Sequence, residues 1–312
     1  MILTFLSKYV RISVYFDWGG TTVGDKRRWG DRKDGVKLRK LDSMHYIMPL
    51  IFPKRCESEI YVHERINLTK TNSYIREKNA EKPEINYSLL QIITAAMLKT
   101  IVLRPQLNRF VASPNIYQRK GLSAAFIVKT SHTDDAEEAM AFVEVEETDT
   151  LDIIKRKIAE QIEACKDEGN KDSSQKAMDF VAVLPAFIRR FIGFVVRSLD
   201  RRGKIPKFMI ANDPHYASLF ISQLGSIKLD AAYHHLTDWG TNSFFMTIGQ
   251  KKMRPYHDAL GNVTMKSSID LGFTVDERIA DGFYFARCLK LFKKLLEHPE
   301  LLEKPFNEEV VF

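Results

Sequence analysis

The sequence predicts a mixed α/β fold in which helices pack on one face of a β-sheet. Residues 60–68 (IYVHERINL) alternate apolar and polar side chains, as expected of a half-buried strand. Residues 86–104 (NYSLLQIITAAMLKTIVLR) instead repeat apolar side chains at three- and four-residue steps, as expected of a helix. Long excursions separate the predicted strands, and this arrangement favours a mixed sheet covered by helices on one side.

The first half of the chain is expected to interleave helices and strands. In order, the elements are strand 60–68, helix 69–78, helix 86–104, two strands joined by a turn within 108–129, strand 142–146 and amphipathic helix 148–166. Pro83 and Pro105 end the first two helices, and Asn86 or Ser88 can cap the second. The regular apolar spacing makes 86–104 the strongest helix prediction of this half.

Residues 180–209 (FVAVLPAFIRRFIGFVVRSLDRRGKIPKFM) differ from the rest because a wide apolar face stands opposite several arginines. The apolar face consists of Phe187, Ile188, Phe191, Ile192, Val195 and Leu199. This pattern fits a core or interface helix, an interfacial helix on an anionic membrane, or a helix that lines an acyl channel. Short strands at 218–222, 244–248 and 266–275 and a final helix at 281–298 follow it.

The ends and the composition define a single folded domain. Residues 1–40 are expected to form a flexible basic arm, because 24–40 (GDKRRWGDRKDGVKLRK) is rich in glycine, arginine and lysine. The folded domain is then 41–312. The start of the chain has neither a basic segment nor a small-residue cleavage site, so no signal peptide is expected. With 45% hydrophobic and 28% charged residues, the chain has the composition of a globular protein.

Charge and cysteine content restrict the partners. The formal net charge is +7, which fits nucleic acid, anionic lipid or a polyanionic cofactor such as coenzyme A. Because the basic residues are spread along the chain, we expect no nucleic-acid partner. Cys56, Cys165 and Cys288 are odd in number and far apart, which argues against a disulfide framework or zinc site. They favour a reducing compartment, so a cytoplasmic protein is expected.

Four segments, in order, carry a resemblance to a known family. They are a long helix followed by Pro-x-Leu-Asn (85–121), SLFISQLG (218–225), SFFMTIG (243–249) and DERIADG with its following helix and HPELL tail (276–302). Through them, residues 44–302 resemble the chloramphenicol acetyltransferase superfamily, and especially the catalytic domains of dihydrolipoyl acyltransferases of 2-oxo-acid dehydrogenase complexes. The resemblance implies a two-layer sandwich and a homotrimer with its active site between subunits.

The resemblance also implies roles for particular residues. The family motif is Asp-His-Arg-x-x-Asp/Asn-Gly, in which the histidine is the general base on a thiol. A serine or threonine hydroxyl stabilises the oxyanion of the tetrahedral intermediate. By position, Ser222 is the oxyanion hydroxyl and Glu277 stands where the family has its histidine. A free glutamate has a pKa of about 4.3 and suits a thiol less well than imidazole does, although burial can raise it by several units.

Other polar residues complete the candidate set. His235, in the pair His234-His235, lies between the Ser222 strand and the next strand and could replace the lost base, or the pair could simply be on the surface. Asp281 can cap the final helix, and in relatives the same position orients the active-site loop. A metal site from this pair and His257 lacks the usual ligand spacing, so no metal is expected.

The sequence therefore predicts an acyltransferase-like protein whose candidate catalytic residues are Glu277, Ser222, Asp281 and His235. If it is active, acyl-coenzyme A or a lipoyl-type thioester is the expected donor, and the acceptor is unknown. The alternative is a catalytically inactive scaffold of the same fold that binds a ligand or a membrane. Residues 180–209 are the candidate for peripheral membrane contact.

Overall fold

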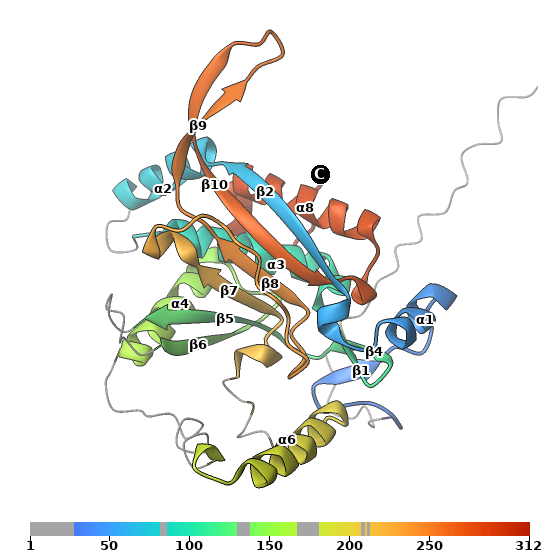
Figure 1. Cartoon of the computed structure of the whole chain (residues 1–312). Helices are drawn as coiled ribbons and strands as arrows, with labels where there is room; N and C mark the ends of the chain where they lie inside the picture. The colour runs from blue at the N-terminus through green and yellow to red at the C-terminus, as the bar shows by residue number, and fades with distance from the viewer. Residues whose placement is uncertain (1–27, 82–85, 130–137, 167–180, 207–209, 211–212) are drawn as a thin grey trace, which may run out of the picture.

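The computed structural model describes residues 28–81, 86–129, 138–166, 181–206, 210 and 213–312 (Figure 1). The helices are α1 (Ser43–Ile51), α2 (Thr69–Glu81), α3 (Leu89–Leu103), α4 (Leu151–Lys166), α6 (Ala186–Arg201) and α8 (Gly282–Glu297). The strands are β1 (Gly35–Lys37), β2 (Glu59–Asn67), β3 (Arg109–Ala112), β4 (Asn115–Arg119), β5 (Leu122–Lys129), β6 (Glu138–Val145), β7 (Leu219–Gln223), β8 (Phe244–Ile248), β9 (Lys252–His257) and β10 (Val263–Asp276).

A seven-stranded mixed sheet forms the centre of the molecule. Its strand order is β2-β10-β8-β7-β5-β6, and β9 pairs with the first half of β10. β7 runs parallel to both β5 and β8, whereas the other pairs are antiparallel. β1, β4 and β3 form a second, three-stranded sheet. The predicted mixed α/β class is confirmed.

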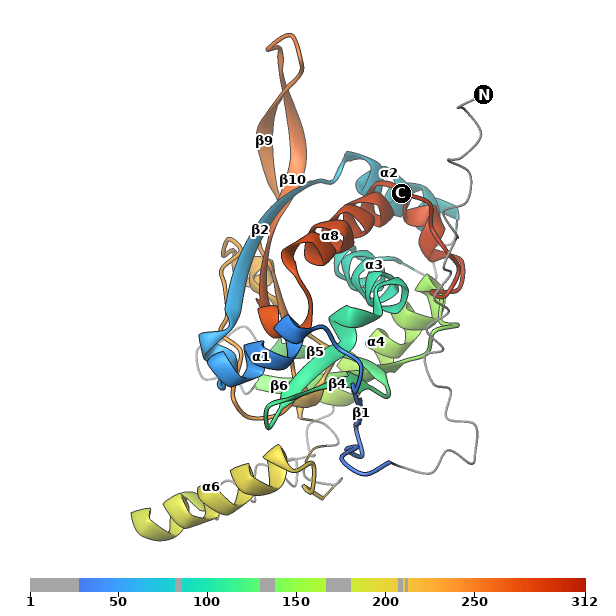
Figure 2. The same ribbon diagram turned by 90° about the vertical axis from the view of Figure 1, so that its right-hand side faces the viewer.

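The main core lies between the large sheet and three helices, α3, α4 and α8, which cover one face (Figure 2). Ser88 begins α3 in a capping box with Gln91, and the helix is buried along most of its length because most of its side chains are apolar. Phe273 of β10 meets Phe292 of α8 edge to face, with ring centroids 6.0 Å apart. The prediction that helices pack on one face of the sheet is confirmed.

The opposite face of the sheet has a smaller apolar cluster. Phe220 of β7 and Phe245 of β8 lie side by side there, 4.6 Å between ring centroids, and Leu236 packs on them. Leu236 belongs to 228–243, which crosses this face without regular secondary structure. Side chains alternate along a strand, so Ser222 and Thr247 lie on the same face as Phe220 and Phe245.

The structure corrects the predicted elements at several places. Residues 108–129 form three strands rather than two, because the chain turns at Lys120 and Gly121 and passes from the small sheet to the large one. Three elements were not predicted: β1, α1 and β9. Each is short, and α1 contains Pro49 while β9 contains Pro255, so neither has a clear periodic pattern.

Part of the expected N-terminal arm forms regular structure. Residues 1–27 lie outside the described part of the chain. Within 28–40, however, β1 pairs with β4 from Gly35 opposite Arg119 to Lys37 opposite Tyr117, and the side chains of Asp31 and Arg32 are buried. The folded domain therefore begins before Leu41, and the flexible arm predicted for 1–40 is wrong for this segment.

α6 accounts for the middle of the apolar segment 180–209, of which 180 and 207–209 lie outside the described residues. The helix projects from the body near the small sheet (Figures 1 and 2). Among the residues described, none belongs to a helix that is both long and apolar enough to cross a membrane.

Candidate active site

Glu277 lies directly after the longest strand of the sheet. β10 remains paired with β2 up to Asp276, where a single turn of 3₁₀ helix, Glu277–Ile279, begins. The Glu277 main-chain N–H donates to the carbonyl oxygen of Ser58 at 2.9 Å, and its side chain is half-buried. The turn is thus joined to the segment that precedes β2 on one side and continues towards α8 on the other.

The residues on either side of Glu277 hold this turn in place through a buried ion pair. Arg278 donates Nε and Nη2 to the two carboxylate oxygens of Asp276 at 2.8 and 2.7 Å, and Nη1 to the carbonyl oxygen of Phe52 at 2.7 Å. The Asp276 carboxylate also accepts the Arg278 main-chain N–H. Asp276 is 0% and Arg278 is 2% exposed, so a bidentate pair of this kind fixes the backbone firmly.

A second buried cation faces the same carboxylate. Arg55 Nε lies 3.8 Å from Asp276, and its Nη2 donates to the carbonyl oxygens of Val111 and Gly240. Burial lowers the pKa of Arg55, and the nearby Asp276 carboxylate works in the opposite direction. Asp276 therefore compensates the charge of Arg278 and contributes, together with Asp200 and Asp238, to compensating that of Arg55.

Asp281 caps α8, as the sequence predicts. Its carboxylate accepts the main-chain N–H of Tyr284 at 2.7 Å, and the side chain is exposed. The N-terminus of a helix leaves main-chain donors unpaired, and Asp281 satisfies one of them. Its predicted second role, orienting an active-site loop, stays a prediction.

Ser222 lies on the face of the sheet opposite the helices. It is half-buried near the end of β7, where it pairs with Thr247 of β8, and Thr247 pairs in turn with Gly272 of β10. The Thr247 hydroxyl donates to the carbonyl oxygen of Ala232, and a side chain on Gly272 would overlap with that same oxygen. The segment 228–243 therefore crosses the sheet in close contact with the row that contains Ser222.

A single chain does not bring Ser222 and Glu277 together. Ser222, Thr247 and Gly272 are paired across three neighbouring strands, so Ser222 and Gly272 lie roughly 10 Å apart across the sheet. Glu277 is five residues further along the chain from Gly272, which is about 16 Å along the strand direction. Hydrogen-bond reach is about 3 Å, so these two residues form no catalytic pair within one chain.

His234 and His235 lie on the same face of the sheet as Ser222. The His234 ring stacks on Phe245 at 4.3 Å and on His235 at 4.6 Å, and both histidines are exposed. His257 belongs to the β9–β10 hairpin, which projects from the body. The described residues contain no group of three or more potential metal ligands.

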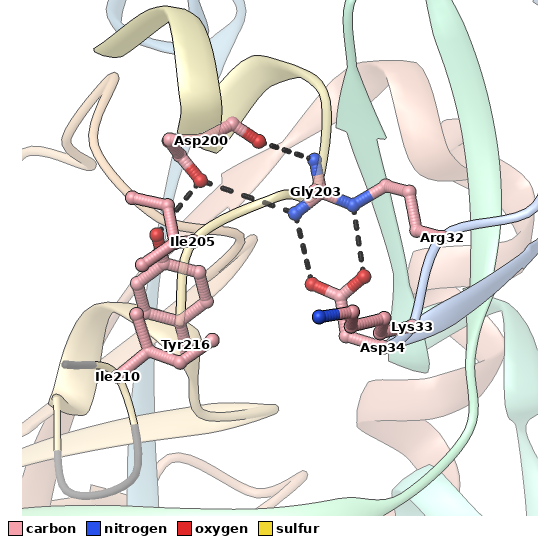
Figure 3. Close-up of a pocket in the computed structure, with 8 residues that line it drawn as sticks. All are labelled: Arg32, Lys33, Asp34, Asp200, Gly203, Ile205, Ile210 and Tyr216. Atoms are coloured by element: carbon pink, nitrogen blue, oxygen red, sulfur yellow. Dashed lines mark hydrogen bonds and ion pairs between the residues drawn. The ribbon is translucent and has the colours of Figure 1, made fainter. Parts of the chain in front are cut away.

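A cluster of buried charges, which the sequence did not predict, joins the N-terminal segment to α6 (Figure 3). Arg32 donates Nε and Nη2 to Asp34 at 2.8 and 2.9 Å, and Nη1 to the main-chain oxygen of Asp200 at 2.7 Å. Tyr216 donates its hydroxyl to the Asp200 carboxylate at 2.7 Å. Burial raises the pKa of Asp200, and hydrogen bonding to Tyr216 and the charge of Arg32 oppose that effect. The cavity beside the cluster measures about 120 Å³, and Arg32, Asp34, Asp200 and Tyr216 around it bond to one another.

Comparison with known proteins supports the resemblance. Residues 210–303 match the model of the 2-oxoacid dehydrogenases acyltransferase (catalytic domain) family. No match was found among curated protein sequences. This part of the chain, which contains Ser222, His235, Glu277 and Asp281, carries the sequence pattern of an acyltransferase catalytic domain.

Solved structures show that the chain has the fold of dihydrolipoamide acyltransferase cores. It is similar to the Azotobacter vinelandii dihydrolipoamide acetyltransferase, with 16% identity over 85% of this chain and 94% of that one and a TM-score of 0.55. It is also similar to the cubic core of the pyruvate dehydrogenase multienzyme complex, with 15% identity over 85% of this chain and 94% of that one and a TM-score of 0.54. A probable dihydrolipoamide acetyltransferase from Listeria monocytogenes is similar as well, with 14% identity over 85% of this chain and 95% of that one and a TM-score of 0.53.

Proposed function

We propose that the protein is an acyltransferase that works at a site shared by two copies of the chain in a homotrimer. The donor is acyl-coenzyme A or a lipoyl-type thioester. The observation that carries the proposal is the buried Asp276–Arg278 pair, which keeps the turn of the family motif in a fixed position although the catalytic histidine is replaced. The cytoplasm is the proposed compartment, because all three cysteines are free.

The Azotobacter vinelandii enzyme supports the choice of residues. That structure was studied for the role of a serine, a histidine and an asparagine in catalysis, and the latter two stand four positions apart in its chain. Glu277 and Asp281 have the same spacing here. Because Ser222 and Glu277 are too far apart within one chain, Ser222 of one copy is proposed to face Glu277 of the next.

The proposed chemistry assigns one task to each residue. Glu277 removes the proton from the acceptor nucleophile as it attacks the thioester carbonyl carbon. The Ser222 hydroxyl donates a hydrogen bond to the oxyanion that forms. Collapse of the tetrahedral intermediate breaks the carbon–sulfur bond, and the leaving thiolate takes the proton back from Glu277. His235 is the substitute base if Glu277 is not the proton acceptor.

The first experiment measures binding of acetyl-coenzyme A by calorimetry and release of free thiol in parallel. The proposal predicts binding and, with water as the acceptor nucleophile, release of free coenzyme A and acetate. Glu277→Gln and Ser222→Ala should each lower the release rate by roughly a hundredfold. Glu160→Gln is the matched control, because Glu160 is an exposed glutamate on α4, far from the motif in sequence. If Glu277→Gln keeps the full rate, Glu277 is not the base, and His235→Ala is tested next.

The shared site is tested by mixing two inactive variants. Trimers assembled from Ser222→Ala and Glu277→Gln chains contain some interfaces at which both wild-type residues meet. Random mixing should restore roughly a quarter of the wild-type activity, because each residue is intact in half of the chains. A site contained within one chain would give no recovery.

A non-catalytic scaffold of the same fold is the second candidate, and Glu277 favours it, because the histidine that suits thiol chemistry at neutral pH is missing. It predicts that acetyl-coenzyme A binds without turnover, and that Glu277→Gln does not change the affinity. Absence of binding at millimolar concentration would exclude coenzyme A as the ligand for both candidates.

A further inference from the structure

α6 exposes an apolar face that the body of the protein does not cover. Within Ala186–Arg201, Asp200 is the only buried residue. Phe187, Phe191 and Phe194 are 73%, 67% and 72% exposed, and Val183 just before the helix is 80% exposed. Figure 2 shows α6 extending away from the sheets and the other helices, so its apolar side chains lie free of the main core.

Apolar and basic side chains occupy opposite halves of this helix. By helical spacing, the apolar half consists of Phe187, Ile188, Phe191, Ile192, Phe194, Val195, Val196 and Leu199. The basic half contains Arg189, Arg190, Arg197 and Arg201. A helix with a broad apolar face, arginines on the other face and low overall hydrophobicity is the type that lies in a membrane interface.

The attachment of α6 leaves Phe187, Phe191, Phe194 and Val195 of that apolar half exposed. Asp200, in the last turn, receives hydrogen bonds from Tyr216 and from the main-chain N–H of Gly240, while its main-chain oxygen accepts from Arg32. These contacts hold the C-terminal end of the helix, and Figure 3 shows those that Asp200 makes with Arg32 and Tyr216. Because Asp200 is the only acidic residue of α6 and is already paired, the arginines have no anion within the helix.

An open hollow of about 390 Å³ lies beside the helix, where the basic and apolar halves meet. Its lining consists of Ser113, Phe194, Arg197, Ser198, Arg201 and Arg202. Three guanidinium groups and two hydroxyls suit a phosphate group, and Phe194 beside them suits the hydrocarbon that a phospholipid carries. The charge of the hollow therefore complements an anionic lipid headgroup.

We propose that α6 binds the protein to the surface of an anionic membrane. The phenylalanines enter the acyl-chain boundary, and the arginines extend to the phosphates at the level of the headgroups. A second copy of the chain is the less suitable occupant, because packing two apolar halves together would leave the arginines of the hollow facing water, without the phosphate that they suit. The proposal does not depend on acyl transfer, since none of these residues belongs to the proposed active site.

The test is flotation of the full-length protein with vesicles of phosphatidylcholine alone or mixed with phosphatidylserine. The protein should float with the mixed vesicles, remain largely at the bottom with phosphatidylcholine alone, and bind less as salt is raised. The variant with Phe187→Ser, Phe191→Ser and Phe194→Ser should have an affinity for the mixed vesicles that is lower by roughly tenfold or more. Leu260→Ser is the matched control and should float like wild type, because Leu260 is 87% exposed at the tip of the β9–β10 hairpin.

A second measurement covers the case in which the triple variant folds poorly. Phe191→Trp places a reporter on the apolar face. Its fluorescence, taken as the difference from the wild type with its three native tryptophans, should shift to shorter wavelength only when anionic vesicles are added. Failure of the wild-type protein to float, or an unshifted Phe191→Trp spectrum, would overturn the proposal. So would a triple variant that floats normally but has a smaller oligomer size without lipid, because that result assigns the face to a second copy.

Discussion

Replacing Asp276 by asparagine should destabilise the protein strongly, although the two side chains have nearly the same shape. The substitution keeps one oxygen but puts an amide group where the carboxylate oxygen accepts Arg278 Nη2 at 2.7 Å. It also removes the negative charge from a position that is 0% exposed. Arg278 and Arg55 would then remain as buried cations, and the new amide N–H group at position 276 would face the Arg278 Nη2 donor.

The magnitude follows from these contacts. Breaking a buried ion pair by removing one partner typically costs about 3–5 kcal/mol, because the remaining charge is uncompensated. The second cation, Arg55 at 3.8 Å, places Asp276→Asn towards the upper part of that range. Such a loss is a large fraction of the roughly 5–15 kcal/mol by which folded proteins are usually stable.

Urea unfolding followed by circular dichroism measures this cost. The control is Glu308→Gln, which breaks the exposed ion pair with Lys304 and should change stability by less than about 1 kcal/mol. Adding Arg278→Met to Asp276→Asn should cost less than the sum of the two single changes, because it removes one of the stranded cations. A cost below about 1 kcal/mol for Asp276→Asn would refute the idea that this carboxylate holds the turn.

Three further changes test other parts of the fold. Gly272→Ala should lower stability by about 1–3 kcal/mol in urea unfolding, because its new methyl group would overlap with the main-chain oxygen of Ala232, in the segment that crosses the sheet. Lys99→Met should cost about 1–3 kcal/mol by the same assay, since the 1%-exposed Lys99 ammonium donates to main-chain oxygens near the C-terminus. Burial alone would raise the pKa of Asp213, but hydrogen bonds from His215 and Trp239 outweigh it and lower the pKa. Asp213 therefore stabilises the fold at pH values above the usual carboxyl pKa of about 3.9, and this contribution is lost as the pH falls. The thermal unfolding midpoint of Asp213→Asn should consequently change less between about pH 5 and pH 3 than that of the wild type.

Local patterns in the sequence predicted the elements that carry their own signals. The capping box at Ser88 and the continuous apolar run identify α3, and Asp281 marks the start of α8. By contrast, β1 is only three residues long and exists because it pairs with β4, about eighty residues further along the chain. The break at Gly121 likewise reflects a change of sheet, which no local pattern encodes.

The candidate site was predictable only in part, for the same reason. Asp276 and Arg278 are two residues apart, so their pairing could be anticipated from the motif. The distance between Ser222 and Glu277 depends on strand register across β7, β8 and β10, which sequence alone does not provide. The cluster around Arg32 joins residues 168 positions apart in the chain, and its members carry no motif.

The pairing of Arg32 with Asp200 also affects how the chain can be made in a cell. Arg32 leaves the ribosome early, but the residue whose oxygen it binds follows 168 positions later. At about 5–20 residues per second, this interval lasts roughly ten to thirty seconds. During that time β1 can pair with β4 and Arg32 can pair with Asp34, whereas the bond from Arg32 to the Asp200 main chain can form only later. The base of α6 is therefore completed late, after much of the first half of the sheet has been synthesised.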